Sequence, residues 1–270
     1  MSVIDHRGIS IALEEAGAGL PVVLLHSFLG SSEIWRGQVP ALAQHHRVIN
    51  IDLRGHGRSG NIEGPFTLYD AVDDVIAVLD ALGIEQAVWC GLSIGGMVAM
   101  RGAIRYPERV AGLVLMDTDA GAETAWNRVR YHVMGSVVSA FGFRPLLPFV
   151  SALMLGATTR RDNPGLVEES RQMIARNHIG SARRCLETLM RRDSVIERLH
   201  EIEVPALVVV GEEDRMLPPS HSRRIRERLP DASLTMIPGA GHMTPLEQPE
   251  RVNTALLAFL ETLAHSRHRA

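Results

Sequence analysis

The chain has 270 residues, of which 46% are hydrophobic and 22% charged, and its formal net charge at pH 7 is −3. This composition is typical of a soluble globular protein with a large core, and the small net charge gives no reason to expect a nucleic acid or an anionic membrane as a partner. Only two cysteines are present, so neither a disulfide framework nor a thiolate metal site is expected.

The first 119 residues alternate short apolar segments with amphipathic ones. Residues 9–14 alternate between apolar and polar side chains, which is typical of a half-exposed strand. Residues 22–25 form a continuous apolar run, as a strand covered on both faces requires. Apolar residues at helical spacing predict a helix over residues 68–82 that stops at Gly83. Further strands are predicted over residues 48–52, 88–90 and 110–116.

The pattern changes after residue 119, because residues 120–199 contain no buried strand and are broken into short helical segments by glycines and prolines. The alternation of strands and helices then resumes. Strands are predicted over residues 206–210 and 233–237, and helices over residues 220–229 and 250–264. Strands separated by helices imply right-handed crossovers and a parallel sheet. We therefore predict one α/β core, residues 1–119 and 200–270, with residues 120–199 inserted as a helical cap after the strand over residues 110–116.

An apolar strand runs directly into the turn Gly91-Leu92-Ser93-Ile94-Gly95, and a helical segment follows. A serine on a tight strand-to-helix turn is pushed out of the sheet with its hydroxyl exposed, and the flanking glycines let strand and helix approach closely. The start of the helix directs free N–H groups toward any negative charge that forms beside the hydroxyl. The turn therefore predicts a nucleophile at Ser93, and the alternative is a glycine-rich packing turn.

A serine hydroxyl needs a base within hydrogen-bond reach, and the base needs a partner that fixes its tautomer. Functional groups of parallel sheets lie beyond the carboxyl ends of the strands. The loops that follow residues 206–210 and 233–237 contain Asp214 and His242. The acid and the base are therefore expected at the same sheet edge as Ser93. The alternative acids are Asp117 and Asp119, which also follow a strand.

Several other polar residues are expected to have structural roles. His26 is expected to orient the loop after its strand, and His56, between two glycines, is read as a turn residue. For Asp117 we expect hydrogen bonds to the loop that enters the insertion. Arg54 and Arg58 are expected to brace loops or face solvent, and the alternative is that they bind an anion. The arginine pairs at 160–161, 183–184 and 191–192 are expected to face solvent.

Together these motifs resemble the α/β-hydrolase fold superfamily, in its serine-nucleophile branch, over essentially the whole chain. The resemblance rests on the Ser93 turn, the Gly-x-x-Asp loop ending at Asp214, the Gly-x-Gly-His segment ending at His242, His26-Ser27-Phe28-Leu29-Gly30, and Asp52-Leu53-Arg54-Gly55-His56-Gly57-Arg58-Ser59. It implies an eight-stranded, mostly parallel sheet flanked by helices, and an oxyanion hole formed by the backbone N–H groups of Phe28 and Ile94. Many relatives have His-Gly in place of His26-Ser27. The stretch Gly-Leu-Ser-x-Gly-Gly-Met is similar to enol-lactonase, lactonase and esterase members.

The predicted function is hydrolysis of small carboxylic esters or lactones through an acyl-enzyme, with no cofactor and no metal. The cap is expected to close an apolar pocket over neutral substrates, lined by Phe28, Trp126, Met134 and Leu146. The competing hypothesis is an anionic enol-lactone held by Arg183 or Arg184. Alternative functions are a cofactor-free perhydrolase (haloperoxidase), a carbon–carbon bond hydrolase and a ligand sensor of the same fold.

The location of the protein is also predicted from the sequence. No apolar run reaches membrane-spanning length, and the first residues carry charges where a signal peptide would have its apolar region. We therefore expect a cytoplasmic protein, a monomer or homodimer, whose partner is a small-molecule ester or lactone rather than a nucleic acid or a membrane.

Overall fold

A computed structural model describes residues 1–267, with side chains described for residues 1–264. Within this part, eight strands form one sheet in the order β1-β2-β4-β3-β5-β6-β7-β8. The strands are β1 (Ser2–His6), β2 (Ile9–Ala16), β3 (Leu20–Leu25), β4 (His46–Ile51), β5 (Ala87–Leu92), β6 (Val110–Met116), β7 (Ala206–Gly211) and β8 (Ala232–Ile237). Strand β2 is antiparallel to β1 and β4, and all other neighbours are parallel. The prediction of an eight-stranded, mostly parallel sheet is confirmed.

The central strands are buried on both faces by helices. Along β3, Val23 and Leu25 belong to one hydrophobic cluster, and Val22 and Leu24 belong to the other. Successive side chains of a strand point to opposite faces, so a continuous apolar run serves two layers. The first cluster includes residues of α2 (Leu68–Ala81), α3 (Ile94–Arg105) and α9 (Pro219–Arg228), and the second includes residues of α1 (Val39–Leu42), α10 (Thr244–Glu247) and α11 (Pro249–Arg267).

Helix α2 shows why the local sequence folds as it does. Thr67 and Asp70 form a capping box, in which each side chain accepts a hydrogen bond from the other residue's backbone N–H. Apolar side chains at helical spacing, such as Val72, Val75 and Leu79, are fully buried against the sheet. Gly83 follows with a φ of 64°, a left-handed conformation that ends the helix as predicted.

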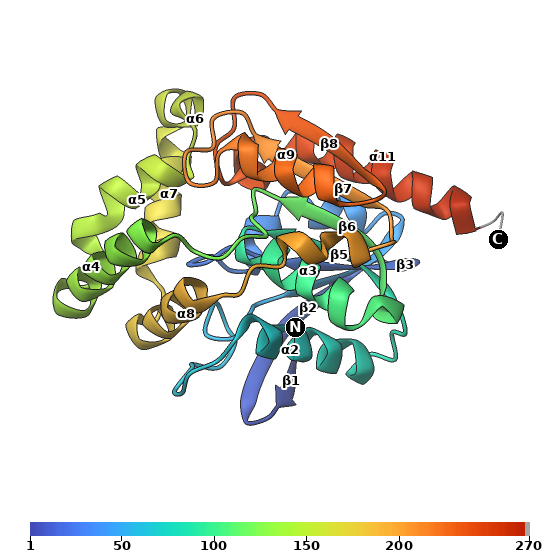
Figure 1. Cartoon of the computed structure of the whole chain (residues 1–270), viewed down its shortest axis with the longest axis horizontal. Helices are drawn as coiled ribbons and strands as arrows, with labels where there is room; N and C mark the ends of the chain where they lie inside the picture. Colours follow the sequence, from blue (N-terminus) through green and yellow to red (C-terminus); the bar gives the residue numbers. More distant parts are fainter. Residues whose placement is uncertain (268–270) are drawn as a thin grey trace.

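Five α-helices occupy the chain between β6 and β7. They are α4 (Ala125–Phe141), α5 (Leu147–Met154), α6 (Ala157–Asp162), α7 (Pro164–Ala175) and α8 (Ile179–Arg191). In Figure 1 they lie together at one end of the sheet, and the end of α11 points away on the opposite side. Because the chain leaves β6 at its carboxyl end, these helices lie over the sheet edge at which Ser93 was expected. We call α4–α8 the inserted helices.

No helix in the described part of the chain is both long enough and apolar enough to cross a membrane.

Candidate active site

Ser93 lies on the turn between β5 and α3, in a backbone conformation that few residues other than glycine adopt. Its φ is 54° and its ψ is −113°, outside the broad regions available to most residues. The glycines on either side are required by packing: a Cβ on Gly91 would lie 2.2 Å from the Gly95 carbonyl carbon, and a Cβ on Gly95 would lie 2.2 Å from the Leu25 carbonyl oxygen. The sharp turn presents Ser93 at the start of α3, whose first N–H groups have no acceptor within the helix.

The loop after β8 carries His242, which contacts the loop after β7. His242 Nδ1 lies 2.8 Å from Asp214 Oδ2. The other carboxylate oxygen of Asp214 accepts the backbone N–H groups of Met216 at 2.8 Å and Leu217 at 2.9 Å. A carboxylate can only accept, so Nδ1 carries the proton and Nε2 is left as the basic nitrogen. Ser93 and His242 line the same cavity, so the predicted nucleophile and base are brought together.

The carboxylates around His242 decide its protonation. Burial disfavours the imidazolium, but the charges of Asp214, Asp117 and Glu247 outweigh burial, so the pKa of His242 lies above its ordinary value of 6.5. Burial and the nearby Asp214 carboxylate raise the pKa of Asp117 well above the usual range for an aspartate. The Asp214–His242 pair therefore stabilises a positive charge on the imidazole.

The two alternative acids are placed elsewhere. Asp117 accepts the Gly211 N–H at 2.8 Å and the Thr244 hydroxyl at 2.5 Å. Asp117 thereby joins the end of β7 to the start of α10. The prediction that it bonds the loop entering the insertion is wrong. Asp119 pairs with arginines and with His221, and His221 Nδ1 lies 3.0 Å from its Oδ1. Asp214 is thus the carboxylate that contacts the His242 ring.

The other sequence-predicted polar residues support the loops. His26 Nδ1 contacts the Ser27 carbonyl at 2.7 Å, and His26 Nε2 accepts the Leu53 N–H at 2.9 Å, which joins the loops after β3 and β4. Burial lowers the pKa of His56 to about 3, so its ring is neutral in neutral solution. Arg54 pairs with Asp74, and Arg58 pairs with Asp52 and Glu14. These four residues have the structural roles expected of them.

The proposed oxyanion donors lie on two loops beside Ser93. Ile94 directly follows Ser93 and is the first residue of α3. Phe28 lines the cavity and lies in a tight turn that the Gly30 N–H closes on the Ser27 carbonyl at 3.0 Å. Leu29 in this turn has a φ of 60°, and its carbonyl accepts the Asn177 amide at 2.9 Å. The loop between α7 and α8 therefore helps to fix the loop that carries Phe28.

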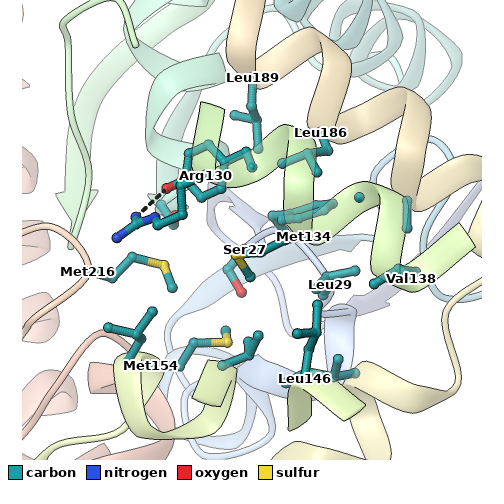
Figure 2. A pocket seen from close by; sticks show the side chains of 18 of the residues that line it. Ser27, Leu29, Arg130, Met134, Val138, Leu146, Met154, Leu186, Leu189 and Met216 are labelled. Atoms are coloured by element: carbon teal, nitrogen blue, oxygen red, sulfur yellow. Dashed lines mark hydrogen bonds between the residues drawn. The ribbon is translucent and has the colours of Figure 1, made fainter. Parts of the chain in front are cut away.

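A cavity of about 130 Å³ lies between this sheet edge and the inserted helices, and most of its lining is apolar. Figure 2 shows Leu29, Met134, Val138, Leu146, Met154, Leu186 and Leu189 around Ser27. Phe28, Met134 and Leu146, three of the expected pocket residues, line this cavity. Its volume is close to the about 150 Å³ of a cavity that holds benzene, so it suits a small substrate group.

Trp126, the fourth expected pocket residue, does not line the cavity, and this prediction is wrong. Its side chain is 76% exposed and shares the outer face of α4 with Val129 and Val133, which are 59% and 57% exposed. Arg130 and Met134 on the same helix face the cavity instead. Because α4 carries apolar side chains on both faces, the helical period alone did not show which face is inward.

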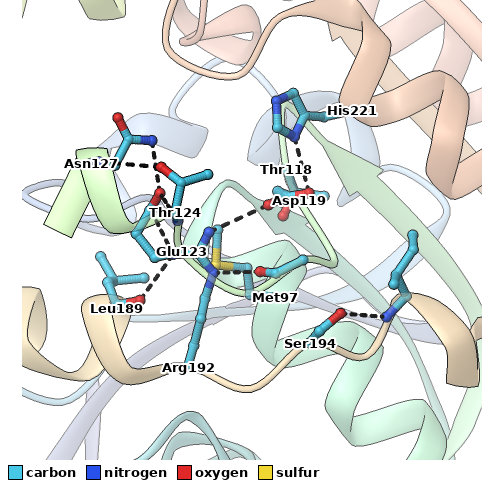
Figure 3. A network of polar contacts seen from close by, with 12 residues as sticks. Met97, Thr118, Asp119, Glu123, Thr124, Asn127, Leu189, Arg192, Ser194 and His221 are labelled. Atoms are coloured by element: carbon cyan, nitrogen blue, oxygen red, sulfur yellow. Dashed lines mark hydrogen bonds and ion pairs between the residues drawn. The ribbon is translucent and has the colours of Figure 1, made fainter.

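The inserted helices are fixed to the core by a buried arginine at the end of α8. Arg192 pairs with Glu123 at 2.8 Å and with Asp119 at 3.3 Å (Figure 3). It also donates to the Gly121 carbonyl at 2.9 Å. Its side chain is 4% exposed. The expectation that the arginine pair at 191–192 faces solvent is therefore wrong for Arg192. The carboxylates that bury it come from residues about 70 positions earlier, and the local pattern does not reveal them.

Comparison with known proteins agrees with the fold. A family model described as alpha/beta hydrolase fold matches residues 21–249. The chain is 29% identical over 247 residues to 3-oxoadipate enol-lactonase 2 of Acinetobacter baylyi, with 90% of both chains covered. It is also similar to the structure of a thermophilic esterase from Thermogutta terrifontis, with a TM-score of 0.92, 32% identity and 97% of both chains covered.

A further similar structure is the enol-lactonase from Burkholderia xenovorans, with a TM-score of 0.90, 25% identity and coverage of 96% of this chain and 100% of that one. The three proteins named here are one esterase and two enol-lactonases. The chain belongs to the alpha/beta hydrolase fold family.

Proposed function

We propose that the protein is a serine hydrolase that cleaves small carboxylic esters or lactones through an acyl-enzyme on Ser93. The observation that carries this proposal is the 2.8 Å contact of His242 Nδ1 with Asp214, in a loop pair that lines one cavity with Ser93. The esterase and enol-lactonase relatives support the substrate class. The inserted helices, within residues 120–199, act as a cap over the core of residues 1–119 and 200–270.

The mechanism follows from these positions. His242 Nε2 takes the proton of Ser93 as its oxygen attacks the carbonyl carbon, and Asp214 stabilises the imidazolium that forms. The backbone N–H groups of Ile94 and Phe28 stabilise the oxyanion, and one such donor is typically worth about 3–4 kcal/mol of the barrier. His242 then protonates the leaving alkoxide, and in the second half-reaction it activates the water that releases the acid. With a lactone, the alkoxide remains tethered to the acyl group.

A turnover screen tests this proposal and also measures which acyl length the pocket accepts. p-Nitrophenyl esters of increasing acyl length are assayed beside simple lactones. Because the cavity is close in volume to one that holds benzene, kcat/KM should fall when the acyl group exceeds roughly eight non-hydrogen atoms. Leu146→Ala should shift the optimum to longer acyl groups, whereas Trp126→Ala, on the outer face of α4, should not. An optimum at long chains in the native protein would contradict the small-substrate assignment.

The same screen separates the alternative functions. Turnover that requires peroxide would indicate a perhydrolase, and cleavage of diketones without ester cleavage would indicate a carbon–carbon bond hydrolase. A ligand sensor of this fold would bind and turn over at most slowly. Multiple rapid turnovers on simple esters therefore favour the hydrolase.

The pH dependence is expected to follow His242. This residue acts as a base only when neutral, and the surrounding carboxylates raise its pKa above 6.5. For a neutral ester, kcat/KM should therefore rise with pH and level off on the alkaline side, with an inflection above pH 6.5. Below the inflection the rate should fall about tenfold per pH unit. The measurement is a kcat/KM profile between pH 5 and 9, and an inflection clearly below 6.5 would contradict the assignment.

A further inference from the structure

Four charged side chains besides His242 line the cavity, and three of them have carboxylate or guanidinium partners. Glu123 and Arg192 pair with each other at 2.8 Å, with side chains 8% and 4% exposed. Arg183 faces Glu187 at 3.9 Å and is half exposed to solvent. The fourth is Arg130 of α4.

Arg130 differs from the others because no carboxylate pairs with it among residues 1–264. Its guanidinium contacts the neighbouring Tyr131: Nη2 lies 3.4 Å from the phenol oxygen, and the guanidinium carbon lies 5.1 Å from the ring centre. Its Nε is buried and has no hydrogen-bond partner among the described residues. A buried N–H donor without an acceptor is uncommon in native proteins, and an acceptor supplied by a ligand is one explanation.

The surroundings of Arg130 point to the cavity as the source of that acceptor. Figure 2 shows Arg130 and Met216 on the same side of the cavity, with Leu189 and Met134 nearby. Met216 lies in the loop after β7 and donates its backbone N–H to Asp214. Arg130 therefore reaches from the inserted helices toward the loop that carries Asp214. In these apolar surroundings a guanidinium interacts strongly with an anion, because little water screens the charge. Its planar donors also match a carboxylate, which accepts two parallel hydrogen bonds.

We propose that Arg130 binds a free carboxylate carried by the substrate at a distance from the scissile carbonyl. The substrate class is then a monoester of a small dicarboxylic acid, or a lactone bearing a carboxylate, rather than a neutral ester. This inference rests on the proposed function and replaces the expected neutral substrate. It also moves the anion site from Arg183 or Arg184, both of which face Glu187, to a residue that the sequence did not single out.

A matched pair of esters tests the inference. Monomethyl glutarate carries the carboxylate, and methyl 5-oxohexanoate replaces it with an uncharged acetyl group of similar shape. The native protein should favour the anionic ester in kcat/KM by about 10- to 100-fold, the range typical of a hydrogen bond to a charged group. Arg130→Gln should remove that preference, mainly through KM, because a remote carboxylate is bound equally in the ground and transition states.

Two further variants exclude a merely structural effect. Arg184→Gln, at an arginine of α8 that pairs with Glu187 and is not among the residues that line the cavity, should leave both esters within about threefold of the native values. Arg130→Lys should recover part of the preference, since it keeps the positive charge without the fork of donors. If Arg130→Gln still turns over the neutral ester, this variant is folded. If it does not fold, the preference between the two esters is measured with Arg130→Lys instead.

The outcomes separate this inference from the proposed function. An unchanged ratio of the two esters in Arg130→Gln, or a native preference for the neutral ester, would overturn the assignment of Arg130 and leave the ester hydrolase intact. If the native protein turns over neither these esters nor the p-nitrophenyl esters, the proposed function fails and the inference fails with it.

Discussion

Replacing Ser93 by alanine is expected to lower kcat on a p-nitrophenyl ester by about 10⁴–10⁶-fold. The hydroxyl is the proposed attacking group, and the other members of the site cannot substitute for it. The stability of the fold should change little. Alanine is smaller than serine, and it has to adopt the same φ of 54° that Ser93 already adopts in this turn. The measurement is steady-state turnover, with thermal unfolding of both proteins as a test of the fold.

Ser27 provides the matched control for this variant. It lines the same cavity, and its hydroxyl contacts Met243 Sδ at 3.7 Å rather than a general base. Ser27→Ala should therefore keep kcat within about tenfold of the native value. A folded Ser93→Ala protein with near-native turnover would show that the nucleophile has been assigned wrongly.

The second large effect is expected at the acid. Asp214→Asn should lower kcat by about 10⁴-fold. The asparagine oxygen can still accept the Met216 and Leu217 N–H groups, which leaves its amide NH₂ facing His242 Nδ1. The imidazole then has to place its proton on Nε2, the nitrogen that should act as the base. Turnover of a single ester, measured for the native protein and this variant, gives the ratio directly.

Asp117→Asn is the variant for comparison. The Asp117 carboxyl contacts the Gly211 N–H and the Thr244 hydroxyl, so its replacement should affect stability more than the chemical step. We expect it to reduce kcat less than tenfold. If Asp117→Asn were the more damaging of the two, the acid of the site would belong to the end of β6.

Much of the sheet edge could be predicted from local sequence. The apolar runs that became β3, β4, β6 and β7 are unambiguous because strands buried on both faces need continuous apolar residues. Asp214 and His242 could be predicted together because the carboxyl ends of parallel strands meet at one edge. Strand β1, in contrast, is an edge strand whose side chains are largely exposed, so it leaves little hydrophobic pattern and was not singled out.

The inserted helices were predicted less well, and for a common physical reason. Trp126 was placed in the pocket although it lies on the outer face of α4, because the orientation of that helix is set by contacts with distant segments. Arg192 is buried by Asp119 and Glu123, and Arg130 faces the cavity with no carboxylate partner in the part of the chain whose side chains are described. In each case the side chain contacts residues that are distant in the sequence, so the pattern of neighbouring residues does not predict its position.

The most direct test of the account is identification of the residue that becomes covalently modified. The native protein is treated with a fluorophosphonate, which traps activated serines, and then analysed by intact mass and by peptide mass spectrometry. We expect one adduct per chain, on Ser93, formed in parallel with loss of ester turnover. Labelling should be strongly slowed in Asp214→Asn and absent in Ser93→Ala. Complete loss of turnover with the adduct on a different residue, or full labelling of Ser93 with turnover unchanged, would contradict the proposed acyl-enzyme mechanism.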